Sequence, residues 1–290
     1  MTPRVTRADE HLAAQPGVGA ALAALGATVI AAEPVTALAL PGSARFAFRV
    51  QLDDGRVVKL RRVLRPEAAA RAWRSIEGES DLPFPRVLAR AGEIVVETWI
   101  DGEPPATPPP PAVLTDAARV LARLHAAALA EPDAPRREPT AAMLRQMRAR
   151  LDELRERWLL DRALAEHLVD LAGRFAPAES AIGITHNDLC GENLVVDRAG
   201  MLWVVDNEAM DVGFLDYDLA RTWYRWGLDA PSWAAFVAAY AAAGGAAPHE
   251  STAPFWRIAA VARSAVVRAA AAPPERDVAL ARLRALAASP

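Results

Sequence analysis

The feature that most constrains this chain is a short hairpin pattern in its second half. Two apolar runs surround the segment 197–200, whose Asp-Arg-Ala-Gly composition is typical of a turn. If Val196 pairs with Met201 across this turn, Asn193 and Asp206 lie at the same end of the ribbon. An amide oxygen and a carboxylate then converge, and these are ligands that a hard cation such as magnesium accepts.

The segment before this ribbon adds a carboxylate of a different kind. Asp188, in a His-x-Asp arrangement with His186, lies on the loop that leads into the ribbon and is placed to accept a hydroxyl proton. Phosphoryl transfer needs such a carboxylate together with two oxygen ligands that hold magnesium on a triphosphate. A metal hydrolase built on His186, Asp188 and Glu192 is less favoured, because the other histidines form no ligand-spaced cluster. Cys190 is better explained as a small buried residue than as a thiol nucleophile.

Composition narrows the class of protein. The chain has 290 residues, enough for two lobes with substantial cores, and a net charge of -3, which argues against nucleic acid as a partner. No segment is apolar for long enough to span a membrane. The stretch 12–32 is uncharged and follows two arginines, loosely like a signal peptide, but prolines and glycines interrupt it and favour a small folded helix. A single cysteine permits no intrachain disulfide, and we expect a cytoplasmic protein.

The first hundred residues have β character. Turn-forming segments separate three apolar runs that predict a meander, a proline begins a helix, and a fourth run predicts a further strand. The predicted elements are strands at 35–40, 45–52, 56–63 and 93–100, and a helix at 66–76. The proline-rich stretch 103–111 then suits a connector.

The remainder of the chain is mostly helical by its apolar spacing. We predict helices at 112–128, 140–160, 161–175, 216–226, 232–243, 254–271 and 275–288. The predicted fold is therefore α+β, with a small β-rich lobe over residues 1–101 and a larger helical lobe over residues 102–290.

Four segments in the same order resemble the aminoglycoside phosphotransferase and choline kinase family. They cover about residues 35–221 and are the catalytic segment, a hinge-like segment, the first helix of the large lobe, and the segment after the metal aspartate: 186–206, 93–102, 121–125 and 215–220. The resemblance implies a two-lobed fold similar to that of protein kinases. It also implies ATP or GTP and Mg²⁺ as cofactors.

The family pattern assigns roles to residues that match it. Asp188 occupies the position of the catalytic base, and Asn193 and Asp206 occupy those of the magnesium ligands. His186 and Asp218 would hold the catalytic loop in shape. The remaining assignments concern the nucleotide: Gly42 and Ser43 over the phosphates, and Glu97, Thr98 and Trp99 around the base.

The family also places a cation from the small lobe on the nucleotide phosphates. Lys59 and Arg61 compete for this role, because both point to the same face of one predicted strand. Lys59 is the only lysine in the chain, which suggests that a compact ammonium is needed there. We therefore choose Lys59, with Glu67 on the following helix as its ion-pair partner.

The expected activity is a small-molecule kinase that transfers the γ-phosphate to a substrate hydroxyl. The family phosphorylates aminoglycosides, amino alcohols such as choline, and sugars, and some members confer antibiotic resistance. A cationic acceptor is the first hypothesis, bound by Glu208, Asp211, Trp223 and Trp226. The alternative is that these aromatics simply pack the large lobe. Asn187, Cys190 and Asn207 depart from the commoner family residues without removing a required charge.

Two other kinds of protein remain as alternatives. A protein kinase is disfavoured, because no GxGxxG loop, Asp-Phe-Gly or Ala-Pro-Glu element is present. A non-catalytic nucleotide-binding module would be favoured only if a required residue were missing. We expect a small-molecule partner and neither nucleic acid nor membrane. The sequence leaves open whether the protein is a monomer or a homodimer.

Overall fold

The structure is a computed structural model that describes residues 12, 15–35, 46–77, 81–129, 139–269 and 273–288. Its contacts divide the chain into two compact units. The first unit contains residues 1–70, 83–105 and 193–209, and the second contains 71–82, 106–192 and 210–290. The hairpin 193–209 thus groups with the N-terminal sheet, whereas the sequence suggested one boundary after residue 101. The fold is α+β, with a small sheet unit and a larger helical unit.

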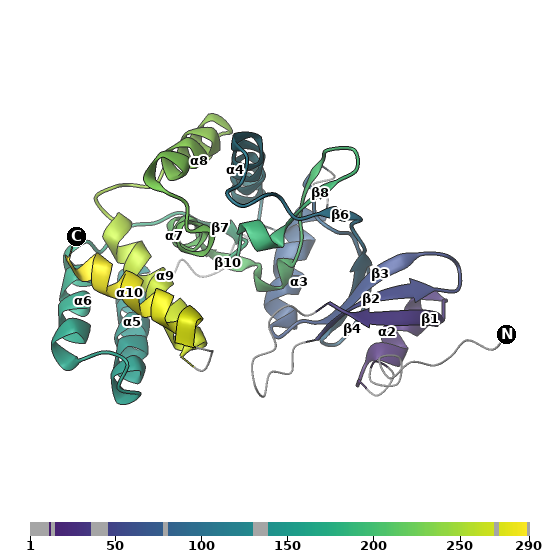
Figure 1. Cartoon of the computed structure of the whole chain (residues 1–290), viewed down its shortest axis with the longest axis horizontal. Coiled ribbons are helices and arrows are strands. Elements are labelled where there is room, and N and C mark those ends of the chain that lie inside the picture. Colours follow the sequence, from purple (N-terminus) through teal and green to yellow (C-terminus); the bar gives the residue numbers. More distant parts are fainter. Residues whose placement is uncertain are drawn as a thin grey trace. The chain divides into compact units, whose positions relative to one another are not determined.

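The first unit is built on a five-stranded antiparallel sheet (Figure 1). Its strand order is β1-β2-β3-β5-β4, and the strands are β1 (Val29–Pro34), β2 (Ala47–Leu52), β3 (Val57–Arg62), β4 (Val87–Ala91) and β5 (Ile94–Thr98). A second, three-stranded sheet joins β6 (Gly102–Glu103), β8 (Leu194–Asp197) and β9 (Leu202–Val204) in the order β6-β8-β9. Helix α2 (Val18–Leu25) packs against β4 and β5.

Alternation along the strands separates the core of this unit from its polar face. Val50 and Leu52 on β2, with Val58 and Leu60 on β3, are buried in one apolar cluster. Because successive side chains of a strand point to opposite faces, Lys59 shares the other face with Arg61. The sheet therefore presents two cations on one face while its other face forms the core.

Strand β1, the first of the described strands, was not predicted from the sequence. Gly26, in the left-handed conformation at φ 63°, ends α2, and the apolar residues that follow pair with β2 as an edge strand. The predicted strand at 35–40 and the turn after it lie almost entirely outside the described residues. Strand β4 was not predicted, because its run is short and only partly buried. The helix predicted at 66–76 is confirmed as α3 (Pro66–Ile76).

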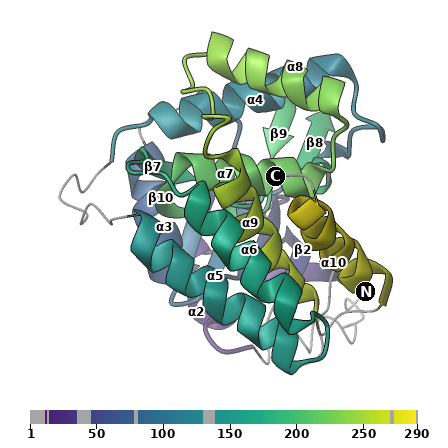
Figure 2. The ribbon, with the colours of Figure 1, turned by 90° about the vertical axis from the view of Figure 1, so that its left-hand side faces the viewer.

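The second unit is mainly a helical assembly (Figure 2). Its main helices are α4 (Pro111–Ala126), α5 (Pro139–Glu156), α6 (Arg162–Arg174), α7 (Leu215–Trp226), α8 (Ala230–Ala242), α9 (Ala253–Arg268) and α10 (Pro273–Ala288). Helix α9 is central: it packs against α5, α6, α7 and α10, and its residues 258–262 are fully buried. Helix α4 packs on α8. All seven helices match predicted ones, with ends displaced by a few residues.

Two short paired strands lie next to the loop that contains Asp188. β7 (Ile182–Thr185) pairs antiparallel with β10 (Asp211–Phe214), which runs directly into α7. This register sets Phe214 opposite Ile182, so α7 begins beside the start of β7, and residues 218–225 of α7 contact the loop that follows β7. In the described part of the chain, no helix has the length and apolar character needed to cross a membrane.

Candidate active site

The loop after β7 is fixed by one buried carboxylate. Asp218, in the first turn of α7, is fully buried and accepts the backbone N–H groups of His186 at 2.7 Å and Asn187 at 2.6 Å. Asn187 has a positive φ of 63°, a conformation that asparagine tolerates better than most residues. The next residue, Asp188, donates its backbone N–H to Nδ1 of His186 at 3.2 Å. His186 and Asp218 therefore have contacts of the loop-shaping kind that the family pattern assigns to them.

Behind Asp218 lies a buried support from two other helices. Nε2 of His125 on α4 is 3.0 Å from Oδ2 of Asp218, and its Nδ1 is 2.7 Å from the hydroxyl of Tyr240 on α8. Burial raises the pKa of Asp218, but the hydrogen bond and charge of His125 outweigh it, so that the pKa lies below its usual value. Burial also raises the pKa of Tyr240. His125 is thus a structural residue that supports the Asp218 carboxylate.

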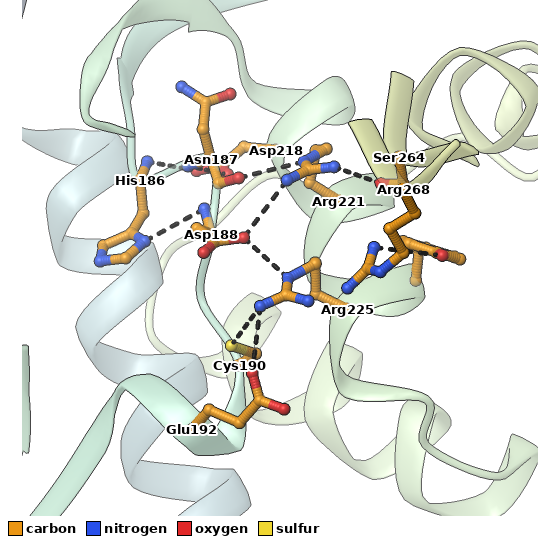
Figure 3. Close-up of polar contacts among 11 residues, drawn as sticks. His186, Asn187, Asp188, Cys190, Glu192, Asp218, Arg221, Arg225, Ser264 and Arg268 are labelled. Carbon is orange, nitrogen blue, oxygen red and sulfur yellow. Dashed lines mark hydrogen bonds and ion pairs between the residues drawn. The ribbon is translucent and has the colours of Figure 1, made fainter. Parts of the chain in front are cut away.

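Asp188 lies beside two arginines of α7 (Figure 3). Its Oδ1 accepts from Nε of Arg225 at 2.8 Å and from Nη2 of Arg221 at 3.2 Å. Burial alone would raise the pKa of Asp188, but the charges of Arg225 and Arg221 outweigh it and hold the pKa below its usual range. The side chain of Asp188 remains 26% exposed. It is therefore an ionised and oriented carboxylate that a solute can reach.

Neither arginine was identified from the sequence. Trp223 and Trp226 are candidates for an acceptor pocket by sequence, and Arg225 lies between them in the chain. The available signal was helical spacing, since Asp218, Arg221 and Arg225 are three and seven residues apart and so share one face of α7. That face meets the loop after β7.

The first unit contains the predicted magnesium ligands. Val196 pairs with Leu202 and Leu194 with Val204, so the predicted pairing of Val196 with Met201 is wrong by one residue. At the turn Asp197 lies opposite Met201: its N–H donates to the carbonyl of Met201 at 3.0 Å, and its carboxylate accepts the N–H groups of Ala199 and Met201 at 2.9 Å each.

Asn193 and Asp206 still lie at the same end of the hairpin, although the register differs from the predicted one by one residue. The carbonyl of Asn193 accepts the N–H of Val205 at 2.8 Å, directly before Asp206. Asp206 has a positive φ of 62°, which is uncommon for a residue other than glycine and is found often at functional sites. Asn193 and Asp206 are therefore close neighbours in one unit.

A cluster of charged side chains surrounds Asp206. Lys59 on β3 is opposite Glu97 on β5, and its Nζ lies 3.7 Å from Oε1 of Glu97 and 3.8 Å from Oδ1 of Asp206. Arg61 is only 1% exposed and grips the Glu97 carboxylate through two atoms, Nε at 3.2 Å and Nη2 at 3.0 Å. Its Nη1 lies 3.8 Å from Asp206 and 3.6 Å from Glu208.

The partner predicted for Lys59 is wrong. Glu67 lies exposed in the first turn of α3, and the carboxylate that pairs with Lys59 is Glu97. The reason is the strand register, which places Glu97 directly across from Lys59. Burial lowers the pKa of Arg61, but the charges of Glu97 and Asp206 outweigh this, so that its pKa is raised and it stays charged.

The residues that the family pattern places around the nucleotide base, Glu97, Thr98 and Trp99, have hydrogen bonds or ion pairs with other residues of the first unit. The N–H of Thr98 donates to Arg86 at 2.9 Å, and the N–H of Trp99 donates to Val57 at 3.4 Å, so both are used within the sheet. The side chain of Glu97 forms ion pairs with Lys59 and Arg61. Gly42 and Ser43, predicted to lie over the phosphates, fall outside the described residues.

The four residues predicted to bind a cationic acceptor all have partners within their own unit. Glu208 faces Arg61, and Asp211 lies 4.0 Å from Arg71. The ring of Trp223 is covered by Arg257 and Arg282, at 4.9 and 5.2 Å from its centre, and Trp226 packs edge-on against Phe236. A cavity beside Trp223 measures about 20 Å³, which accommodates little more than one water.

The donors around Asp206 fit a hard cation. In the described ranges no group of three or more His, Cys, Asp or Glu side chains is arranged to hold a metal ion. Magnesium bound with a nucleotide needs fewer protein ligands, because phosphate and water oxygens complete its octahedron. The neighbouring Asn193 and Asp206, with Asp206 41% exposed, supply oxygen donors of the required type.

Each unit thus contains part of what the pattern of kinase-like phosphotransferases requires: an oriented carboxylate in the second unit, and oxygen donors beside a lysine in the first. The family can be stated as well: residues 36–256 match the APH family, described as "Phosphotransferase enzyme family", and the chain belongs to it. No curated protein matches the sequence.

Solved structures with the same fold are similar over most of their length. A macrolide 2'-phosphotransferase type I has a TM-score of 0.67 at 19% identity, with coverage of 98% of this chain and 99% of that chain. A choline kinase from Cryptosporidium parvum Iowa II has a TM-score of 0.65 at 13% identity, with coverage of 88% and 87%. An aminoglycoside-3'-phosphotransferase of type VIII has a TM-score of 0.54 at 21% identity, with coverage of 84% and 98%. At these identities the similarity is one of fold.

Proposed function

We propose that this protein transfers the γ-phosphate of ATP to a hydroxyl group of a small molecule, with Asp188 as the catalytic carboxylate. Asp188 accepts the hydrogen bond of the acceptor hydroxyl and orients its oxygen toward the phosphorus. The hydroxyl proton passes to Asp188 or to the transferred phosphate as the bond to phosphorus forms and the bond to the ADP oxygen breaks. Such a reaction depends mainly on positioning and on stabilising the charge of the transferring group.

Asn193 and Asp206 would hold Mg²⁺, which neutralises charge on the nucleotide phosphates when it is bound. Lys59 supplies a further positive charge to the phosphates. Arg61 has a different role in this proposal: because it is buried and grips Glu97 through two atoms, it fixes the carboxylate that holds Lys59.

The observation that carries the proposal is the contact of Lys59 with Asp206, at 3.8 Å. The one lysine of the chain lies next to the carboxylate that the family pattern assigns to the metal. The family match over residues 36–256 supports the same roles. GTP remains the alternative nucleotide, and we place the activity in the cytoplasm, where both nucleotides are abundant.

The acceptor is best sought without a bias toward cations. The residues predicted to hold an ammonium group already contact arginines or aromatic rings of the chain. The panel should therefore contain aminoglycosides, macrolides and choline-like amines together with uncharged sugars, hydroxy acids and serine-containing peptides. ATP consumption reports turnover for all of them.

The test combines nucleotide binding with transfer. Wild-type protein should bind ADP more tightly with Mg²⁺ than with EDTA and should phosphorylate at least one acceptor. Asp188→Ala should keep nucleotide binding and lose transfer by about 100-fold or more. Binding without any transfer would instead support a non-catalytic nucleotide-binding module. Transfer to peptides alone would support a protein kinase.

A further inference from the structure

Arg225 and Arg221 tie α7 to the whole loop that carries Asp188 (Figure 3). Arg221 donates to the carbonyl of Asn187 at 3.0 Å and to Oδ1 of Asp188 at 3.2 Å. Arg225 donates to the same Oδ1 at 2.8 Å and lies 3.6 Å from Sγ of Cys190 and 3.2 Å from Glu192. Two side chains, four residues apart on one helix, thus hold the loop over residues 187–192.

The two arginines differ in what else they contact. Arg221 is buried and also donates to Ser264 of α9 at 2.6 Å, so its removal would disturb both a backbone carbonyl and a second helix. Among the described residues, the hydrogen bonds and ion pairs of Arg225 are with side chains of the loop, and its nearest partner is Asp188 at 2.8 Å. Glu192 is 81% exposed, and such an ion pair contributes little to stability. The contact of Arg225 that matters most is therefore the one with Asp188.

The two arginines determine both the basicity and the orientation of the Asp188 carboxylate. A carboxylate paired with two guanidinium groups is a weak base, but its orientation is well defined, because both donors meet one oxygen. Phosphoryl transfer gains more from the orientation of the hydroxyl than from a strong base. The arginines therefore supply what this reaction needs from Asp188.

We propose that Arg225 is a positioning residue for phosphoryl transfer, which fixes the Asp188 carboxylate through Oδ1 and so sets the direction from which Asp188 orients the acceptor hydroxyl. This inference rests on the proposed function. It assigns a role to a residue of α7 that lies outside the catalytic loop and the metal-binding hairpin.

The test compares Arg225→Gln with Arg225→Lys and with a matched control, Arg268→Gln. Arg268 is half-buried on α9 and contacts the hydroxyl of Tyr224 at 3.3 Å, so this control removes a guanidinium close to α7 without touching Asp188. Each variant is assayed for transfer to the best acceptor of the panel and for ATP hydrolysis, in which water is the acceptor. Thermal unfolding shows whether each variant is folded.

In Arg225→Gln we expect kcat to fall by about 10- to 100-fold, the scale on which small errors of placement act, while KM for ATP changes by less than about three-fold. Arg225→Lys should recover part of kcat, because an ammonium can still pair with Asp188. Arg268→Gln should keep the wild-type kcat. A role in stability alone would lower the unfolding temperature without this division between kcat and KM.

The outcomes separate the two proposals. If wild-type protein is active and folded Arg225→Gln is as active as Arg268→Gln, the role of Arg225 is wrong and the proposed function stands. If Arg225→Lys is no better than Arg225→Gln, charge at this position is not what positions Asp188, and the inference fails. If wild-type protein neither hydrolyses ATP nor phosphorylates any acceptor, the proposed function itself fails.

Discussion

Lys59 and Arg61 are neighbours on one face of β3, but they differ in burial and in the ion pairs that they form. Arg61 is buried and forms a forked pair with the buried Glu97, whereas Lys59 is partly exposed and lies between Glu97 and Asp206. A buried charge that loses its partner is strongly destabilising, and a partly exposed one is less so. The arginine is therefore a structural part of this unit, and the lysine is the cation that a ligand can reach.

This difference predicts opposite effects of two methionine substitutions. Lys59→Met should weaken binding of Mg²⁺·ADP by about 10-fold, because a charge on the phosphates is lost, and should change stability little. Arg61→Met should destabilise the protein by about 3–5 kcal/mol, because Glu97 is left buried without its forked partner. Calorimetric titration and urea unfolding measure the two effects. Equal loss of stability in both variants would contradict the division of roles.

Asp218 permits a prediction about pH. In the folded protein the pKa of Asp218 lies below its ordinary value, so the ionised carboxylate contributes stability at pH values above the pKa that Asp218 has in the unfolded chain. This contribution is lost as the pH falls through the folded pKa. Asp218→Asn should therefore be less stable than wild type by about 2–3 kcal/mol near pH 7, since hydrogen bonds to a charged group are lost. Thermal unfolding between pH 3 and pH 7 should show this gap shrinking below about pH 4. A gap that is constant or grows toward low pH would argue against the role of Asp218.

The short strand β6 supports the hairpin that carries the proposed magnesium ligands. Gly102 pairs with Asp197 and lies so close to β8 that an added Cβ would overlap the backbone carbonyl of Val196. A carbonyl in a sheet cannot move aside as a flexible side chain could. Asn193 directly precedes Leu194, the first residue of β8. A displaced β8 would therefore also displace Asn193, a proposed magnesium ligand.

The effect of Gly102→Ala on stability should therefore differ from that of a glycine substitution at a position with free space. We expect it to destabilise the protein by about 1–3 kcal/mol, as overpacking does, and to weaken Mg²⁺-dependent ADP binding. Gly19→Ala is the control, because Gly19 is exposed within α2 and an added Cβ meets no atom within 4 Å. That variant should be stabilised by about 0.5–1 kcal/mol. Urea unfolding decides the case, and a neutral Gly102→Ala would mean that β6 does not constrain β8.

The two units of the molecule have separate apolar cores. One core lies under the first sheet, and the other is built around α9 from helices of the second unit. The proposed nucleotide ligands Lys59, Asn193 and Asp206 all belong to the first unit. A ligand that binds only the folded protein stabilises it by an amount that grows with the logarithm of the ligand concentration divided by the dissociation constant.

Mg²⁺·ADP at 100 times its dissociation constant should stabilise the protein by about 2.7 kcal/mol, and so raise the unfolding temperature by roughly 5–10 °C. EDTA or Asp206→Ala should remove most of this shift, because a metal ligand is withdrawn. Asp101→Ala is the control: Asp101 is an exposed carboxylate of the same unit, paired with Arg198. A shift that survives EDTA and Asp206→Ala would contradict the metal site.

Features encoded by neighbouring residues were predictable from the sequence. Helix α3 begins at Pro66, and Asp161 caps α6 by accepting the N–H of Leu164 at 2.7 Å, so both positions could be read from local chemistry. The motif that places Asn193 and Asp206 together was also predictable, since both lie on one hairpin. Even there, the predicted register was wrong by one residue, because Met201 lies opposite Asp197, whose carboxylate accepts the N–H groups of Ala199 and Met201 in the turn.

Partnerships between distant residues were decided only by the tertiary structure. Glu97, rather than Glu67, holds Lys59, because strand pairing places it opposite. Arg221 and Arg225 reach Asp188 because the pairing of β7 with β10 brings α7 beside the loop. Caps and helical periodicity depend on residues within a turn or two of one another, so the sequence states them directly. An ion pair across a sheet or between a helix and a loop depends on which side chains converge after folding, and the Arg pair on Asp188 is therefore the part of this site that only the folded chain reveals.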